Sequence, residues 1–199
     1  PHGITVDPSG DFWYISLAHG NPFGTLVKYS TETNQAVART TLGLFPASME
    51  ISAITGFLYC VNFNLHGSMK PSNVSVVDPE TMTEITKITT GSMPHGSRLS
   101  TDGLFQYSVA MMSGELFEID ALDLKVSRVL NLENKMMNDK KMDGKMMDHN
   151  DMKGKMMTND KKENMMSNMD GMKHSMVKPT WVIPHPKENI AYVAGNGSD

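Results

Sequence analysis

Four stretches of the sequence align with one another without a gap, and this repetition limits the fold more than any other feature. They read PHGITVDPSGDFWYISLA, PASMEISAITGFLYCVNF, PHGSRLSTDGLFQYSVAM and PTWVIPHPKENIAYVAGN. Each begins at a proline, at Pro1, Pro46, Pro94 and Pro179. Each carries a tyrosine at the same offset, at Tyr14, Tyr59, Tyr107 and Tyr192. Turn-forming residues divide each stretch, so each predicts two strands joined by a turn.

A second pair of strands follows in the first three copies. Its sequences are GTLVKYSTETNQAVART, SNVSVVDPETMTEITKI and GELFEIDALDLKVSRVL, in which apolar and polar residues alternate around a tight turn. Each unit is therefore predicted to be a meander of four antiparallel strands. The starting prolines are 45 and 48 residues apart, and a four-stranded unit at such a period is typical of a β-propeller. The predicted fold class is all-β, with about three and a half propeller blades in this chain.

The third interval between repeats is longer than the others. It runs from Pro94 to Pro179, which is 85 residues, and removing residues 135–176 restores the period. We therefore expect residues 1–134 to form three blades and residues 177–199 to form the first half of a fourth. Residues 135–176 are expected to be an insert between the last strand of one blade and the first strand of the next.

The repeat resembles the YVTN-type β-propeller repeat. In that pattern P-x-G opens the innermost strand, a D-G turn and an aromatic-Tyr-Val strand follow, and V-x-V-I-D precedes a threonine. The matching residues here are Pro94-His95-Gly96, Asp102-Gly103, Phe105 to Val109, and Val76-Val77-Asp78 with Thr81. The resemblance covers nearly the whole chain outside the insert. It implies a ring of about seven blades, a periplasmic or extracellular location, and a native protein that is longer than this chain.

The insert has an internal period of ten residues. Its units are KMMNDKKMDG, KMMDHNDMKG, KMMTNDKKEN and the degenerate MMSNMDGMKH. With Met176 just after them, they hold 13 of the 19 methionines. From Glu133 to Met176 there is no Leu, Ile, Val, Phe, Tyr or Trp. Such a segment cannot offset the entropy of ordering, so we expect it to be disordered on its own. A period of ten also places the methionine pairs on no single helical face.

The sulfur atoms of the insert suggest a soft metal. Thioethers are soft, neutral ligands that suit Cu(I), and imidazoles bind copper as well. The insert also resembles the Met-rich regions of periplasmic copper-handling proteins, so we predict copper as its ligand. The predicted ligands are Met136, Met137, Met142, Met146, Met147, His149, Met152, Met156, Met157, Met165, Met166, Met169, Met172, His174 and Met176. The alternatives are a low-complexity expansion without a ligand and a sink for oxidants built from reversibly oxidised methionines.

Strand order predicts which connections share a face. Because successive strands reverse direction, the connection from the second to the third strand and the connection between blades lie on the same face. This face should carry the insert, with Met69, Met93, Met111 and Met112. It should also carry four histidines, which form a second and weaker candidate copper site, namely His2, His19, His66 and His95. The alternative role for these histidines is hydrogen bonding to loop backbone. His185 is expected on the opposite face.

The remaining features narrow the choice of function. The net charge of −4 does not indicate nucleic-acid binding, and no apolar run is long enough to span a bilayer. The single cysteine, Cys60, is expected to be a buried, inert thiol. Asp78 and Asp120 end strands and are expected to fix turns.

Three functions remain open. The first is an extracytoplasmic binding protein that binds or buffers Cu(I) and presents its insert to a partner protein on the same face. The second is a propeller enzyme, lactonase-like or with a copper or redox hub, whose site further blades complete. The third is a metal-free scaffold for protein interactions.

Overall fold

The computed structural model describes residues 1–133 and 177–196. Blade 1 consists of β1 (Ile4–Val6), β2 (Phe12–Leu17), β3 (Thr25–Ser30) and β4 (Ala36–Thr41). Blade 2 consists of β5 (Pro46–Ile51), β6 (Leu58–Asn62), β7 (Pro71–Asp78) and β8 (Thr83–Ser92). Blade 3 consists of β9 (Pro94–Leu99), β10 (Phe105–Ala110), β11 (Glu115–Asp120) and β12 (Lys125–Asn131). A fourth sheet pairs β13 (Pro179–Pro184) with β14 (Ala191–Gly195).

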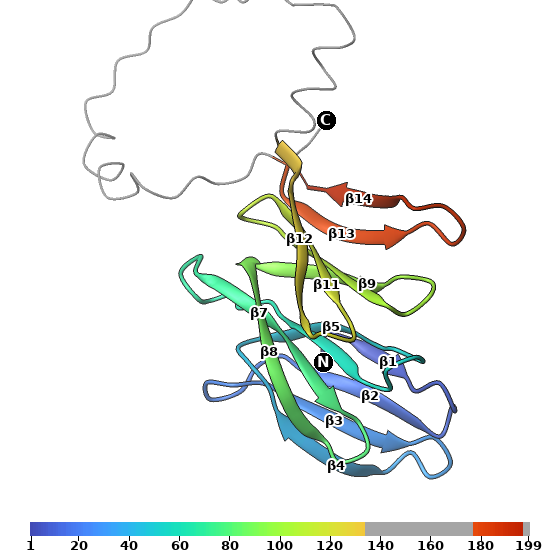
Figure 1. Cartoon of the computed structure of the whole chain (residues 1–199). Coiled ribbons are helices and arrows are strands. Elements are labelled where there is room, and N and C mark those ends of the chain that lie inside the picture. The colour runs from blue at the N-terminus through green and yellow to red at the C-terminus, as the bar shows by residue number, and fades with distance from the viewer. Residues whose placement is uncertain (134–176, 197–199) are drawn as a thin grey trace, which may run out of the picture.

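Each sheet is an antiparallel meander in which sequence neighbours pair, as the repeats predict. The first strands of successive blades also lie next to one another, β1 beside β5, β5 beside β9 and β9 beside β13. Figure 1 shows the sheets following one another in chain order, with β13 and β14 beyond blade 3. The described residues contain no helix with the length and apolar character that crossing a bilayer requires. The predicted insert, residues 135–176, lies outside the described residues.

Close approach of the first strands explains the P-x-G pattern. A Cβ atom on Gly3 would lie 2.1 Å from the carbonyl oxygen of Ala47, and one on Gly96 would lie 2.6 Å from that of Thr180. Only glycine allows neighbouring first strands to come so near. In blade 2 the equivalent residue is Ser48, whose hydroxyl donates a hydrogen bond of 2.6 Å to the carbonyl oxygen of His95.

In blades 2 and 3, an aspartate holds the turn between the third and fourth strands. The Asp78 carboxylate accepts hydrogen bonds from the Thr81 hydroxyl at 2.7 Å and the Glu80 amide at 2.9 Å. The Asp120 carboxylate accepts bonds from the amides of Leu122 and Asp123, both at 2.9 Å. These bonds hold the pKa of each carboxyl below its usual value. The predicted turn role of both aspartates is confirmed.

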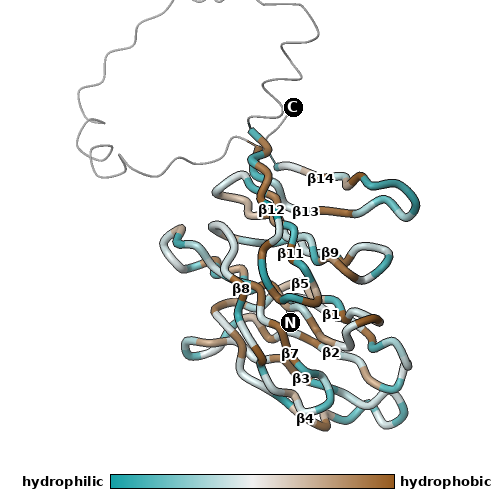
Figure 2. The backbone as a smooth tube through the Cα atoms, viewed as in Figure 1, coloured by the Kyte–Doolittle hydropathy of each residue, from teal (hydrophilic) through white to brown (hydrophobic). Residues whose placement is uncertain are grey.

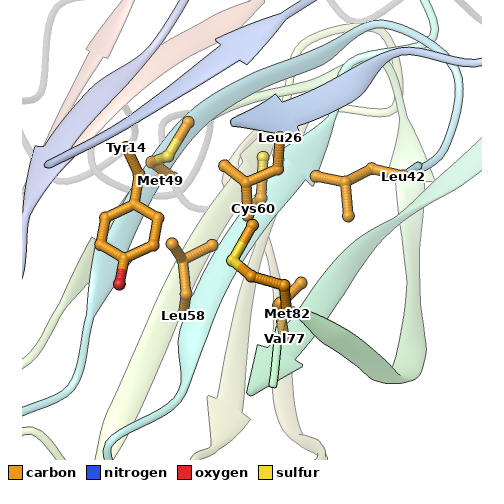
Figure 3. Close-up of a cluster of buried hydrophobic side chains, with 8 residues drawn as sticks. All are labelled: Tyr14, Leu26, Leu42, Met49, Leu58, Cys60, Val77 and Met82. Atoms are coloured by element: carbon orange, nitrogen blue, oxygen red, sulfur yellow. The ribbon is translucent and has the colours of Figure 1, made fainter. Parts of the chain in front are cut away.

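The cores lie between blades. Figure 2 shows the apolar residues running along strands such as β13, while its turn is hydrophilic. Between blades 1 and 2 the core holds Tyr14, Leu26, Leu42, Met49, Leu58, Cys60, Val77 and Met82, as Figure 3 shows. Cys60 is fully buried, and this burial raises the pKa of its thiol to about 12. The predicted burial of this thiol is therefore confirmed, and its raised pKa supports the prediction that it is inert.

Three of the repeated tyrosines pack between neighbouring sheets, and one of them, the partly buried Tyr107, packs against the core between blade 3 and the β13–β14 sheet. Tyr14 is part of the first core, and Tyr59 belongs to a second core between blades 2 and 3. The Tyr59 hydroxyl donates a hydrogen bond of 3.0 Å to the carbonyl oxygen of Ala121. Tyr192, the equivalent residue on β14, is 59% exposed, and no further blade covers it in the described chain.

Candidate metal-binding face

One face of the blades gathers the histidines and methionines that lie outside the insert. We call it the His–Met face and define it by His2, His19, Phe45, Phe63, His66, Met69, Met93, His95, Met111 and Met112. Hydrogen bonds tie its connections together. The Met111 amide donates to the carbonyl oxygen of Met93 at 3.0 Å, and the Ser92 hydroxyl donates to that of Met69 at 2.6 Å. Loops far apart in the sequence thus form one surface.

The four predicted histidines come together as two pairs. The ring centroids of His2 and His95 are 5.7 Å apart, and those of His19 and His66 are 5.9 Å apart. Phe45 links the pairs, because its ring lies 4.8 Å from that of His19 and 5.6 Å from that of His2. Topology therefore predicted the gathering of these residues correctly, although their role as metal ligands stays a prediction.

The four methionines of the face pack around the same aromatic residues. Met93 and Phe63 are buried together with Ala47, and Phe45 packs against them. Partly buried methionines complete the cluster, namely Met69, Met111 and Met112. Sequence reasoning placed these methionines on the face but missed Phe45 and Phe63, whose rings are 5.7 Å apart. An aromatic residue directly before the repeat proline, as in Phe45-Pro46, was the available signal.

The residue before the proline has an unusual backbone in every junction between blades that the structure describes. Its φ angle is +55° at Phe45, +53° at Met93 and +40° at Lys178. This left-handed region is costly for side chains with a Cβ atom, by about 1–3 kcal/mol each. Phe45 and Met93 nevertheless adopt it, and both side chains enter the aromatic and methionine cluster. The residues with this costly backbone conformation thus contribute their side chains to the His–Met face.

His95 is the histidine of the face whose ring orientation is fixed. Its Nδ1 atom lies 3.0 Å from the carbonyl oxygen of Thr180. A carbonyl oxygen can only accept a hydrogen bond, so Nδ1 of the neutral ring carries the proton and Nε2 keeps its lone pair. Beside it, the pKa of His2 is lowered, chiefly by burial and then by His95. The His2 ring is therefore favoured in the neutral form that binds metals.

The His19–His66 pair stands at a small cavity of about 250 Å³. Most of the cavity lining is apolar and includes Phe45, Leu44 and Leu65. Both histidines are exposed at its edge. Among the described residues, no group of three or more His, Cys, Asp or Glu side chains is placed to bind one metal ion. Imidazole sites on this face are therefore limited to pairs, with thioether or water as further ligands.

His185 lies in the turn between β13 and β14, which is the opposite face, as predicted. Its Nδ1 atom accepts a hydrogen bond of 2.9 Å from the Glu188 amide, and its ring lies 6.2 Å from that of Tyr192. It caps a turn and has no histidine neighbour among the described residues.

The opposite side of the inner strands contains one half-buried carboxylate. Glu50 accepts a hydrogen bond of 2.5 Å from the Leu99 amide and lies 3.3 Å from Nε of Arg98. The Arg98 guanidinium in turn stacks over the Trp181 ring at 4.5 Å. Burial raises the pKa of Glu50, although the Leu99 amide and Arg98 oppose this shift. Both of its oxygens are engaged in joining blade 2 to blade 3.

The predicted ligands within the insert lie outside the described residues. They are Met136, Met137, Met142, Met146, Met147, His149, Met152, Met156, Met157, Met165, Met166, Met169, Met172, His174 and Met176. The structure does describe both flanks of this segment. After β12, the Leu132 amide donates to the carbonyl oxygen of Gly114, in the loop that carries Met111 and Met112. Before β13, Lys178 occupies the position that Phe45 and Met93 occupy in the other junctions. Both flanks therefore adjoin the His–Met face.

No protein-family model and no curated protein matches the sequence. Solved structures do match it. Hydrazine synthase of Kuenenia stuttgartiensis has 25% identity and a TM-score of 0.57, and the match covers 65% of this chain and 35% of that one. A functionally unknown protein of Desulfotomaculum acetoxidans has 12% identity and a TM-score of 0.55, covering 65% and 42%.

The WD40 repeats of RRP9 have 11% identity and a TM-score of 0.53, covering 64% of this chain and 37% of theirs. This chain thus spans less than half the length of the structures that it matches. The likeness to WD40 repeats and the four-stranded antiparallel sheets together confirm the predicted fold. The chain is an all-β protein built from β-propeller blades.

Proposed function

We propose that this protein binds and buffers copper through the Met-rich insert, which its propeller blades present on the His–Met face. One observation carries the proposal. The described flanks of the insert, at Leu132 and Lys178, adjoin the face that holds Met69, Met93 and their neighbours. The insert, which holds most of the methionines of the chain, is thus attached beside the His–Met face, where further thioether and imidazole groups gather.

The chemistry of these groups supports Cu(I) in particular. Thioethers are neutral and soft, and they have no proton to lose, so they bind Cu(I) across a wide pH range. The 13 methionines of the insert are sufficient for several ions at three or four sulfurs each. Copper handling of this kind, together with the YVTN-type repeat resemblance, supports a periplasmic or extracellular location. A copper-exchanging partner protein on the His–Met face belongs to the same proposal.

A Cu(I) titration against a chromophoric competitor tests the proposal. The full chain is compared with a variant in which the 13 methionines from Met136 to Met176 are replaced by leucine. Leucine keeps the size and apolar character of methionine but has no sulfur. The full chain is expected to bind several Cu(I) ions, and the leucine variant is expected to lose most of them. Equal stoichiometry for the two would overturn the proposal.

The cluster methionines provide a matched control. In a second variant Met69, Met111 and Met112 are replaced by leucine, while the insert is unchanged. Its Cu(I) stoichiometry is expected to stay close to that of the full chain, because most thioethers remain. If this variant loses more copper than the insert variant, the insert is not the main binding segment.

A further inference from the structure

We propose that His2 and His95 form a copper site of their own, in which Nε2 of His95 and one nitrogen of His2 bind a single ion. This site extends the proposed function to a second kind of copper ligand. It rests on the proposed function only for the choice of copper as the metal. It uses imidazole nitrogens rather than thioethers, and it can be tested separately from the insert.

The spacing of the two rings fits one shared ion. An ion ~2.0 Å from one nitrogen of each ring lies ~3.1 Å from each ring centroid, so the centroids of two ligating rings are at most ~6.2 Å apart. The centroids of His2 and His95 are 5.7 Å apart, with the ring planes at 75°. The spacing of the two rings is therefore short enough for both to bind one ion in a bent arrangement.

The ring of His95 is held as ligating histidines usually are. Its Nδ1–H donates to the carbonyl oxygen of Thr180, which fixes both the tautomer and the ring orientation. In metal sites the nitrogen that does not bind the ion commonly makes such a bond to a carbonyl or carboxylate, and the bond makes the ligating nitrogen more basic. The hydrogen bond thus leaves Nε2 of His95 ready to bind.

The side chain of His2 can change its orientation, whereas hydrogen bonds hold its backbone in place. Its amide donates a hydrogen bond of 2.9 Å to the carbonyl oxygen of Ser16, and the next amide, of Gly3, is bonded to the Ser16 hydroxyl at 2.8 Å. The His2 side chain itself is only partly covered by its neighbours. Its ring can therefore turn toward an ion at low cost while its Cα atom stays beside β2.

The surroundings favour copper over other divalent ions. Among first-row divalent ions, Cu²⁺ binds imidazole sites most strongly. Within the described residues no carboxylate or thiol joins the two rings in a larger ligand group. The ring centroid of Phe63 lies 4.9 Å from that of His95, and Phe63 packs with Met93, so a thioether belongs to the adjoining cluster. Such a donor set is unsuited to Mg²⁺ or Ca²⁺, which need oxygen ligands.

The His19–His66 pair has the same spacing but lacks this support. Its centroids are 5.9 Å apart, yet no ring nitrogen of this pair is hydrogen-bonded to a carbonyl oxygen in the described part of the chain. Both rings are exposed, so neither tautomer nor orientation is fixed. This pair is therefore the comparison site on the same face.

The test uses Cu(II) binding to the full chain, followed by electron paramagnetic resonance against a competing chelator. Cu(II) selects imidazole nitrogen over thioether, so the methionines of the insert contribute little. His149 and His174 are replaced by alanine in every sample. For this test, a few residues are added before Pro1 in every sample, because a free amino group next to a histidine can itself chelate copper. One tightly bound Cu(II) with nitrogen hyperfine structure is expected.

The substitution His95→Asn separates binding from folding. An asparagine amide can donate to Thr180 in place of Nδ1–H, but it has no counterpart of Nε2. We expect H95N to keep the thermal unfolding midpoint of the parent and to lose at least tenfold in Cu(II) affinity, as H2A should. The control H185A should bind Cu(II) as the parent does, and H66A, in the comparison pair, should lose much less Cu(II) affinity than H95N. Parent-like affinity in H95N, or an equal loss in H66A, would overturn the proposal.

The outcome is distinguishable from that of the insert experiment. If the insert fails to bind Cu(I) while the Cu(II) signal still depends on His2 and His95, the imidazole site stands and the proposed function falls. If the 13 leucine substitutions abolish Cu(I) binding while H2A and H95N leave Cu(II) affinity unchanged, the proposed function stands and the imidazole site falls. Nitrogen-15 spectra of the imidazoles check the tautomer directly, because His95 should appear as the Nδ1–H form without metal.

Discussion

The hydroxyl of Tyr59 on β6 donates a 3.0 Å hydrogen bond to the carbonyl oxygen of Ala121, which follows β11 in the next blade. Tyr59 is fully buried and packs in the core between blades 2 and 3 with Val76, Ile88 and Ile119. The repeated tyrosine thus joins neighbouring blades through a buried polar bond as well as through apolar contact.

The substitution Tyr59→Phe is expected to destabilise the protein. It keeps the ring but leaves the buried Ala121 carbonyl without its donor, which costs about 1–3 kcal/mol. Urea unfolding followed by circular dichroism measures the loss. Tyr192→Phe is the matched control, because Tyr192 occupies the same repeat position and is 59% exposed. Equal unfolding midpoints for Y59F and the parent would show that the bond contributes nothing.

Gly96→Ala should destabilise the junction between blade 3 and the β13–β14 hairpin. The new Cβ would lie 2.6 Å from both the carbonyl oxygen of Thr180 and the Cα atom of Trp181, which are backbone atoms and cannot turn away. Overpacking of this kind typically costs about 1–3 kcal/mol. The control is Gly10→Ala, which has an unfavourable φ of +81° but no atom within 4 Å. G96A should also weaken Cu(II) binding, because His95 bonds to the same carbonyl, whereas G10A should not.

Cys60 is expected to be unreactive in the folded protein. Burial raises the pKa of its thiol to about 12, so a chromogenic disulfide reagent at pH 8 should label it only after denaturation. The folded state holds the proton more tightly than the unfolded state, whose thiol ionises near pH 9. The contribution of the Cys60 thiol to the free energy of unfolding is therefore complete below pH 9. It falls by about 1.4 kcal/mol per pH unit between pH 9 and 12.

Replacing Cys60 by alanine isolates this pH effect. The slope of stability against pH should become shallower in C60A above pH 9, as measured by urea unfolding at several pH values. Tyr14, whose pKa burial also raises to about 12, contributes to the slope in both proteins. An identical slope in C60A and the parent would contradict the prediction.

Mild peroxide treatment should oxidise the methionines in order of their exposure. Met49, Met82 and Met93 are at most 7% exposed, whereas Met69, Met111 and Met112 are only partly buried. Peptide mass spectrometry should therefore show sulfoxide at the second group before the first. If sulfurs of the His–Met face bind Cu(I), prior loading with Cu(I) should slow oxidation of the second group and leave Met49 unaffected. Oxidation of Met49 before Met111 would contradict the burial that the structure shows.

Periodicity was sufficient to predict the blades and the placement of side chains by face. The repeat registers predicted β6, β10 and β14 through their shared tyrosine, and strand direction alone placed His19 and His66 on the same face. These predictions depend only on the alternation of apolar and polar residues along a strand and on the reversal of direction between successive strands. The first is a local property and the second a topological one. The burial of Cys60 followed in the same way from its place in a repeated strand.

The contacts within the His–Met face could not be predicted in the same way. The bond from His95 to Thr180 and the ring of Phe45 between His2 and His19 depend on how neighbouring blades are rotated and on side-chain rotamers. The stacking of Arg98 on Trp181 has the same origin. These contacts join residues that different repeats supply, and no periodic signal marks them. Within this face, the sequence therefore named most of the residues but not their pairing.

The left-handed backbone before each repeat proline has a consequence for how such a protein can change. The same geometry accepts Phe45, Met93 and Lys178, which are aromatic, thioether and cationic side chains. The residue before the proline can thus be exchanged without a change in the strands, and one substitution per blade alters the chemistry of a whole face. The long segment before Lys178 belongs to one of these junctions, where added chain length costs little free energy because the loop-closure entropy grows only slowly with loop length. Modules with new ligand preferences could therefore be grafted at any of these junctions while the blades themselves stay the same.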